Sequence, residues 1–114
     1  IITTAHAVNA KATPTRFVNM AKQGYQVDEE ALRGDIYRYF HFGIHIKKKK
    51  VNGKTVRYLS EIVEYLDGEK TNTVFEMKVE DDKFIPQIGT YSNDFKNKLI
   101  EFGSIYKGLP CYNY

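Results

Sequence analysis

The sequence contains no tryptophan, a single cysteine and only three prolines in 114 residues. One cysteine cannot form a disulfide within the chain, so a disulfide scaffold is excluded, and the lone thiol fits a reducing, cytosolic setting. No apolar run approaches the roughly 18–20 residues that a membrane-spanning helix requires. Nine tyrosines and seven phenylalanines supply the aromatic content, which is enough to build the core of one domain.

Charge is distributed in blocks rather than evenly along the chain. The formal net charge is +3, yet residues 47–57 carry six bases and no acid, and residues 58–82 carry eight acids and two bases. A domain that binds nucleic acid along a uniformly basic face would not alternate in this way. We therefore expect no specific nucleic-acid binding, and we expect the acids after residue 60 to oppose any weak binding by the basic block.

Two helices are predicted in the first forty residues. Thr13 followed by Pro14 is typical of a helix start, with threonine as the N-cap and proline at the first helical position. Gly24 predicts the end of this helix. Asp28 and the two glutamates that follow it place carboxylates at the start of a second helix, where the helix dipole favours them.

From Tyr39 the apolar residues recur with a period of two, which predicts a strand to Ile46. Asn52–Gly53 is the strongest short signal for a β-hairpin. The segment that follows, up to Leu66, is therefore predicted to return as the antiparallel partner of the first strand.

The remaining chain predicts shorter elements. Strands are expected at 73–79 and at 84–85, and a last helix is expected to begin at a cap formed by Ser92 or Asn93. The opening segment Ile1–Thr4 has the pattern of the end of a buried strand. The expected order is thus β-α-α-β-β-β-(β)-α, with the first strand in the centre of the sheet.

Two apparent ligand motifs fail on spacing. Gly53–Thr55 resembles the tail of a phosphate-binding loop, but Lys48 stands where that loop requires a glycine, and such a loop joins a strand to a helix. His41 and His45 share one strand face but lie about 13 Å apart at ~3.3 Å per residue, too far to share one metal ion. No metal site is expected.

The lysine run Lys47–Lys50 has two interpretations. Alternation along a strand divides it between two faces, so it does not form one cationic stripe. A solvated hairpin tip, whose lysines also discourage edge-to-edge pairing of strands, is the favoured interpretation. Contact with anionic lipid or nucleic acid is the alternative.

The segment Thr3–Ala7 places hydroxyls and an imidazole directly after the expected buried strand. The carboxyl edge of an α/β sheet is where such folds bind ligands. His6 is therefore a candidate functional residue, although a structural histidine packed in the core would satisfy the same pattern.

The sequence Thr3-Thr4-Ala5-His6-Ala7 resembles the second half of the His box of the type II/type IV secretion traffic ATPases. These proteins are the ring-forming motors of secretion systems, pilus assembly and conjugation. Thr13–Met20 is similar to the helix after the His box in that family. Arg57–Glu64 is similar to the family's hairpin strand, in which an arginine precedes a Thr/Ser-Glu-Ile sequence.

The resemblance continues into the second half of the chain. The stretch Val74–Gly89 is similar to the pilus-assembly branch of the family, and Phe95, Leu99 and Gly103 fit the helix that follows there. Gly89 and Thr90 reverse the family's usual Thr-Gly order. The resemblance covers residues 1–105 and leaves 106–114 as a tail.

The resemblance implies an α/β fold, namely the C-terminal portion of a RecA-like P-loop ATPase domain with a small antiparallel sheet, or hairpin, and flanking helices. It implies that His6 is a phosphate sensor, that Thr4 lies near the nucleotide, and that Arg16 and Arg57 make subunit contacts or have structural roles. ATP and Mg²⁺ would bind the parent protein. The phosphate-binding loop would lie upstream of Ile1, so this chain alone is expected to hold no cofactor and hydrolyse no ATP.

The resemblance also implies partners and a location. The parent would form a homo-hexamer in the cytoplasm, at the cytoplasmic face of the membrane, against an inner-membrane platform protein. The alternative is a free-standing binding module in which Lys47–Lys54, the lysine-rich part of the basic block, contacts nucleic acid or an anionic membrane.

Overall fold

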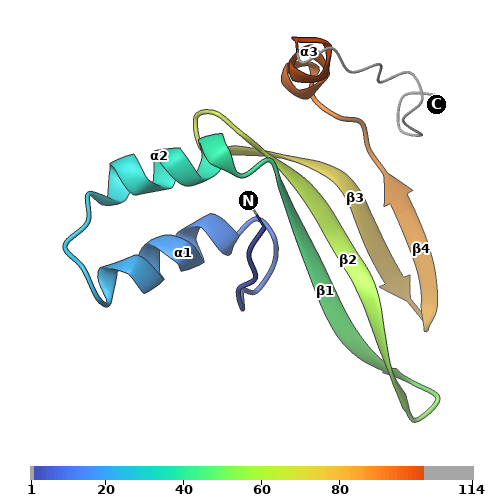
Figure 1. The fold of residues 1–114 in the computed structure, drawn as a ribbon. Helices are drawn as coiled ribbons and strands as arrows, with labels where there is room; N and C mark the ends of the chain where they lie inside the picture. Colours follow the sequence, from blue (N-terminus) through green and yellow to red (C-terminus); the bar gives the residue numbers. More distant parts are fainter. Residues whose placement is uncertain (1, 102–114) are drawn as a thin grey trace.

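Three helices and four strands make up residues 2–101, the part of the chain that the computed structural model describes (Figure 1). In chain order the elements are α1 (Thr13–Lys22), α2 (Glu29–Tyr39), β1 (Phe42–Val51), β2 (Lys54–Leu66), β3 (Lys70–Glu80), β4 (Lys83–Ile88) and α3 (Asn93–Glu101). Gly103, which the resemblance assigned to the last helix, the tail 106–114 and the single cysteine, Cys111, lie outside the described residues.

The sheet is an antiparallel meander in which each strand pairs with the next, in the order β1-β2-β3-β4. Asn52 and Gly53 have φ angles of 51° and 78°, which is the backbone of a tight two-residue hairpin turn that matches the twist of the strands. The predicted hairpin is confirmed. A second turn of this kind joins β3 to β4, because Asp81 and Asp82 also have positive φ angles.

The ends of the helices differ in part from the sequence predictions. Asp28 caps α2 by accepting a hydrogen bond from the Ala31 amide at 3.2 Å. Ser92 caps α3 through its hydroxyl, which accepts from the Phe95 amide at 3.2 Å. The prediction for α1 is wrong by one residue, since the N-cap is Ala12 and the Thr13 hydroxyl instead donates to the Asn9 carbonyl.

The first strand begins later than the alternating pattern predicted. The α2 helix continues to Tyr39, and the amide of Phe40 still donates to the Ile36 carbonyl at 3.0 Å. The prediction that a strand starts at Tyr39 is therefore wrong, and β1 starts at Phe42. These residues stay in the helix because the backbone amides of its last turn have hydrogen-bond acceptors one turn earlier.

The predicted strand at Ile1–Thr4 is wrong for the residues that the structure describes. Ile2, Thr3 and Thr4 lie outside any strand and are exposed. A strand needs a neighbour to satisfy its backbone amides and carbonyls, and β1 pairs within the described chain with β2 alone. The chain forms an antiparallel sheet with flanking helices, and the RecA-like class stays a prediction.

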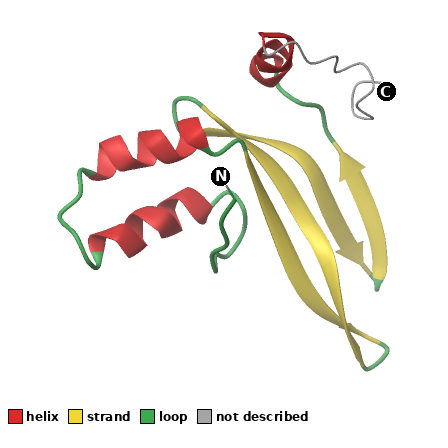
Figure 2. Cartoon of the chain, in the orientation of Figure 1, coloured by secondary structure: helices red, strands yellow, loops and turns green. Residues whose placement is uncertain are grey.

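Different elements contact the two faces of the sheet, and both α2 and α3 lie near the end of it opposite the hairpin tip (Figure 2). On one face the core consists of Ala10, Val63 and Tyr65, with Tyr37 and Phe40 packed against them. This core joins α2 and the loop before α1 to the middle of the sheet. Its small size means that few residues of the chain are fully buried.

The other face holds α3 at one end and is otherwise open. The rings of Phe42, Tyr91 and Phe95 lie 5.0–5.6 Å apart and attach the start of α3 to β1. Beyond them Ile44 and Ile88, on opposite edge strands, have exposed fractions of 64% and 63%. Within residues 2–101, these two isoleucines are therefore left largely uncovered.

The molecule is extended for its length. Its principal extents are 47 × 40 × 20 Å and its radius of gyration is 16.5 Å, against about 13 Å for a compact domain of this size. The hairpin of β1 and β2 accounts for part of this shape, because its tip projects beyond the rest of the sheet (Figure 1).

Candidate functional site

A groove of about 700 Å³ runs along the free edge of β1. One wall is the N-terminal segment from Ile2 to Ala7, and the other is the first half of β1, from Phe42 to Ile46. Phe17 of α1 and Phe40, whose rings stack with their centroids 5.9 Å apart, close one end. The groove is named the β1-edge groove below.

The β1-edge groove contains both of the residues that sequence reasoning placed near a nucleotide. Thr4 and His6 line it, and both are exposed. They stand on an irregular segment beside an edge strand, so the prediction that His6 lies at the carboxyl end of a buried strand is wrong. His6 is not a core histidine in this structure.

Arg16 and Arg57 do not belong to the groove. Arg16 is exposed on α1, and Arg57 is exposed near the hairpin tip, where it stands opposite Lys48 on β1. His41 and His45 are also separated, because His45 lines the β1-edge groove and His41 lines a different pocket.

The chemistry of the β1-edge groove is apolar. Among residues 2–101, no lysine, arginine, aspartate or glutamate lines it, and its ionisable side chains are His6, His45 and Tyr65. A phosphate group bound there would meet hydroxyls and imidazoles but no full positive charge. The cation that phosphoryl transfer requires would have to come from elsewhere.

Tyr65 is a site residue that sequence reasoning missed. Its hydroxyl donates to the Ala10 carbonyl at 2.6 Å and is buried. Burial raises the pKa of Tyr65, which outweighs the lowering by a hydrogen bond with Thr13, while Tyr37 and Glu61 add to the rise. Burial also raises the pKa of Tyr37, whose ring meets Tyr65 edge-on at 5.7 Å. The signal available in the sequence was Gly43, since a glycine inside a strand often marks a close approach.

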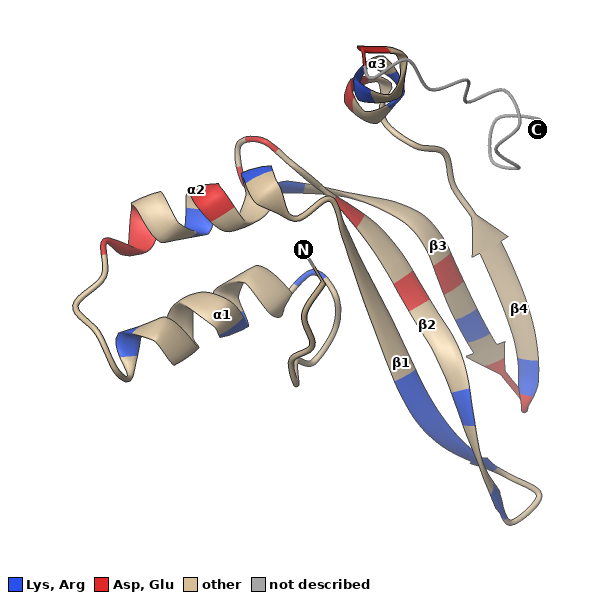
Figure 3. Ribbon diagram, in the orientation of Figure 1, with Lys and Arg blue, Asp and Glu red and all other residues tan. Residues whose placement is uncertain are grey.

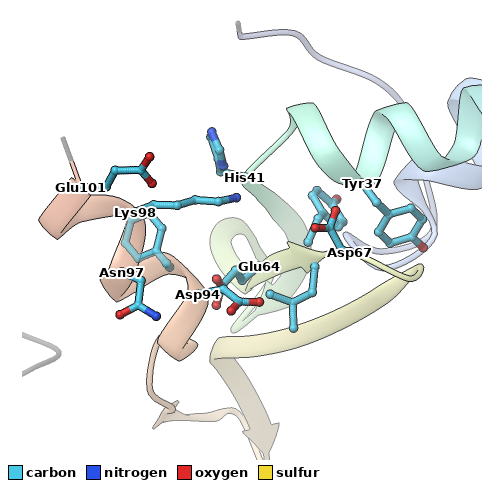
Figure 4. Close-up of a pocket in the computed structure, with 11 residues that line it drawn as sticks. Tyr37, His41, Glu64, Asp67, Asp94, Asn97, Lys98 and Glu101 are labelled. Carbon is cyan, nitrogen blue, oxygen red and sulfur yellow. The ribbon is translucent and has the colours of Figure 1, made fainter.

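A smaller pocket of about 270 Å³ lies between α3 and the end of β2 (Figure 4). It is lined by four carboxylates and by one lysine, Lys98. Glu64 is 3% exposed, and its carboxylate is held by the Ser92 amide at 2.9 Å, the Ser92 hydroxyl and the Asn72 side chain. The acidic lining disfavours a phosphate ligand, and the contacts of Glu64 fasten α3 to the sheet.

The basic block forms the tip of the β1–β2 hairpin (Figure 3). Lys49 is paired with Asp82, with 3.3 Å between its Nζ and the carboxylate. The other five bases of the block are exposed; they are Lys47, Lys48, Lys50, Lys54 and Arg57.

The acids after residue 60 lie at different distances from the basic block, and whether they oppose its binding stays a prediction. Glu61, Glu64, Asp67 and Glu69 lie toward the opposite end of the hairpin, and Glu64 is buried. Along the strand, Glu61 lies about 13 Å and Asp67 about 33 Å from Arg57, and both distances exceed the ~8 Å screening length at physiological salt. Asp82, in the turn between β3 and β4, pairs with Lys49 of the block.

Residues 2–101 contain no group of three or more His, Cys, Asp or Glu side chains arranged to hold a metal ion. No helix in that range has the length and apolar character needed to cross a membrane.

The chain is 46% identical, over 121 aligned residues and 98% of its length, to an uncharacterized protein of Bacillus anthracis. It covers 27% of that relative, so it spans about a quarter of the relative's length. No family model matches the chain, and no solved structure matches it.

Proposed function

We propose that this chain is the C-terminal part of the ATPase domain of a ring-forming secretion, pilus-assembly or conjugation ATPase, and that His6 contacts the terminal phosphate of ATP. The observation that carries the proposal is the β1-edge groove, in which Thr4 and His6 stand together beside the edge of β1 that no strand of residues 2–101 pairs with. The order of the motifs that resemble the traffic ATPases supports it.

The β1-edge groove supplies groups that can contact a phosphate but no charge that can neutralise it. Imidazole and hydroxyl groups can hydrogen-bond a phosphate oxygen, but they do not neutralise its charge. The lysine and Mg²⁺ that do so belong to a phosphate-binding loop, which the proposal places in another part of a longer protein. The relative in Bacillus anthracis is long enough to hold such a loop in addition to this chain.

The exposed apolar surface supports the same proposal. Ile44 and Ile46 of β1 are 64% and 63% exposed and stand on a sheet edge that no other strand of residues 2–101 joins. Surfaces of this kind are normally covered in a stable protein, because open strand edges promote aggregation. In the proposal, other parts of the ATPase domain cover this strand edge.

The proposal places the protein in the cytoplasm, as a homo-hexamer at the cytoplasmic face of the membrane, with ATP and Mg²⁺ as its ligands and a membrane platform protein as its partner. Arg16 and Arg57, both exposed, are available for contacts between subunits.

The test is Mg²⁺-dependent ATP hydrolysis by the full-length protein that carries this chain, with His6→Ala compared with His41→Ala. Both histidines are exposed, but His41 lies outside the groove. We expect His6→Ala to lower turnover about 100-fold, as loss of one transition-state hydrogen bond does, at an unchanged melting temperature. The His41→Ala variant should match the wild type.

Two results would contradict the proposal. One is a full-length protein that shows no Mg²⁺-dependent turnover. The other is a His6→Ala variant with normal turnover per folded molecule.

A second candidate function follows from the hairpin tip. Five exposed bases on a projecting hairpin are suited to an anionic membrane or nucleic acid, with each contact weakened by salt. Binding to anionic vesicles or duplex DNA that Lys48→Ala and Lys50→Ala together abolish, in a protein without ATPase activity, would favour this candidate over the first.

A further inference from the structure

The side chain of Tyr65 crosses β1 and reaches the segment that carries His6. The Tyr65 amide donates to the His41 carbonyl at 3.0 Å, which sets Tyr65 beside the start of β1. Its ring lies over Gly43, where a Cβ atom would overlap the hydroxyl. Gly43 therefore leaves the space through which the Tyr65 hydroxyl donates to the Ala10 carbonyl at 2.6 Å.

Two more side chains of the hairpin hold the same segment. The Glu61 carboxylate accepts a hydrogen bond from the Ala10 amide at 2.5 Å. The Nε2 atom of His45 lies 3.2 Å from the Ala7 carbonyl, and it donates a hydrogen bond to this oxygen when it carries a proton. Both backbone groups of Ala10 are thus held by residues more than 50 positions away.

These contacts end where the exposed part of the segment begins. Ala10 is 1% exposed, whereas His6 and the residues before it are exposed. Ala7, one residue after His6, is the first point at which a side chain of the hairpin holds this backbone. The position of His6 along the β1-edge groove therefore depends on the hairpin.

We infer that His45, Glu61 and Tyr65, with Gly43 as the space for Tyr65, form a clamp by which the β1–β2 hairpin positions His6. The inference rests on the proposed function for the role of His6, but the clamp itself does not. A displacement of the hairpin relative to the helices moves Ala7 and Ala10, and with them the imidazole. His45, Glu61 and Tyr65 are positioning residues that act through the backbone of the segment.

The first test is hydrogen exchange, followed by mass spectrometry, on peptides that cover residues 6–12 of the full-length protein. We expect Gly43→Ala and Glu61→Ala each to speed exchange in these peptides by tenfold or more, while peptides from β3 keep the wild-type rate. The matched control is Tyr37→Phe, which keeps the ring against Tyr65 and removes no clamp contact. Unchanged exchange in Gly43→Ala and Glu61→Ala would overturn the clamp.

A double-mutant cycle separates the clamp from a general loss of stability. Gly43→Ala and Tyr65→Phe remove the same hydrogen bond, so their effects on exchange in residues 6–12 should be less than additive. Fully additive effects would show that Gly43 and Tyr65 act independently and would overturn the arrangement.

The second test is ATP turnover by the same variants. A positioning role predicts that Tyr65→Phe lowers kcat by about tenfold and leaves the KM for ATP within twofold, at a temperature well below the melting temperature of the variant. Normal kcat in Tyr65→Phe, in a protein where His6→Ala lowers it, would overturn the positioning role. If His6→Ala also leaves turnover unchanged, the proposed function fails while the exchange result still decides the clamp.

Discussion

The two ends of the β1–β2 hairpin share the same antiparallel backbone pairing, but one end is packed against the core and the other is exposed to solvent. At the end near the helices, Val63 and Tyr65 are buried in the core, and Tyr65 and Glu61 contact the N-terminal segment. At the tip, five of six bases are exposed and the sixth is paired with Asp82. Antiparallel pairing continues through both ends, apart from one register shift between His45 and Ile46.

The comparison separates the local features that form a hairpin from the long-range contacts that attach it to the rest of the molecule. The tip forms on its turn residues and alternating pattern, without a core. The other end is held by contacts between residues far apart in the sequence. Changes at the core end should therefore alter stability and the position of His6, whereas changes at the tip should have smaller effects on stability and leave the position of His6 unchanged.

The largest expected effect uses two valines of β2, one at each end. Val63 has no exposed surface, whereas Val56 is half-buried beside the tip. We expect Val63→Ala to lower the free energy of unfolding by about 2 kcal/mol, from lost burial and the cavity left behind. Val56→Ala should cost under about 1 kcal/mol. Chemical denaturation measures both, and equal losses would show that the two ends are not distinct.

An intermediate effect is expected at Tyr65. Tyr65→Phe leaves the Ala10 carbonyl without its donor, which should cost about 1–2 kcal/mol of unfolding free energy at pH 7. Tyr25→Phe, on the exposed loop before α2, is the matched control and should cost nothing measurable.

The same variant has a distinct pH dependence. Because burial raises the pKa of Tyr65 in the folded state, the unfolded chain loses this proton at a lower pH than the folded chain does. The contribution of Tyr65 to the free energy of unfolding is then constant below about pH 10 and falls as the pH rises toward the folded-state pKa. Tyr65→Phe should flatten this alkaline decline, and a decline of wild-type steepness in the variant would show that other groups cause it.

The smallest effect is expected at the tip. Lys49→Ala removes the ion pair with Asp82 across the surface of the sheet and should cost at most about 0.5–1 kcal/mol, less at high salt. Lys48→Ala, which removes an equal charge from an exposed position beside it, is the control. Thermal melting at low and at high salt checks the pair, and a cost for Lys49→Ala that salt does not reduce would contradict an ion pair.

Local chemistry was sufficient to predict several elements. Asn52–Gly53 predicted the hairpin because few residues other than glycine and asparagine adopt positive φ readily. Asp28 and Ser92 predicted helix starts because their side chains accept hydrogen bonds from backbone amides a turn away. Each of these signals acts within four residues, so no knowledge of the remaining chain was needed.

The sequence predictions were wrong where secondary structure depends on a hydrogen-bonding partner elsewhere in the chain. Ile1–Thr4 has the composition of a buried strand, but composition does not supply the partner whose backbone completes the hydrogen bonds. Tyr39 fits the alternating pattern of β1, yet it is the last residue of α2, where the helix supplies its hydrogen bonds. Residue types therefore indicated which segments favour a strand, and the available hydrogen-bond partners decided whether a strand formed.

The sequence by itself determined the turns, the helix starts, the alternating strands and the presence of a histidine after a hydroxyl-rich segment. The tertiary structure alone decided that this segment lies along the free edge of β1, and that Tyr65, passing over Gly43, holds it at Ala10. The physical reason is range: turn and cap chemistry acts between residues that are close along the chain. The contacts of Glu61 and Tyr65 with Ala10 join residues 51 and 55 positions apart, which only the folded chain brings together.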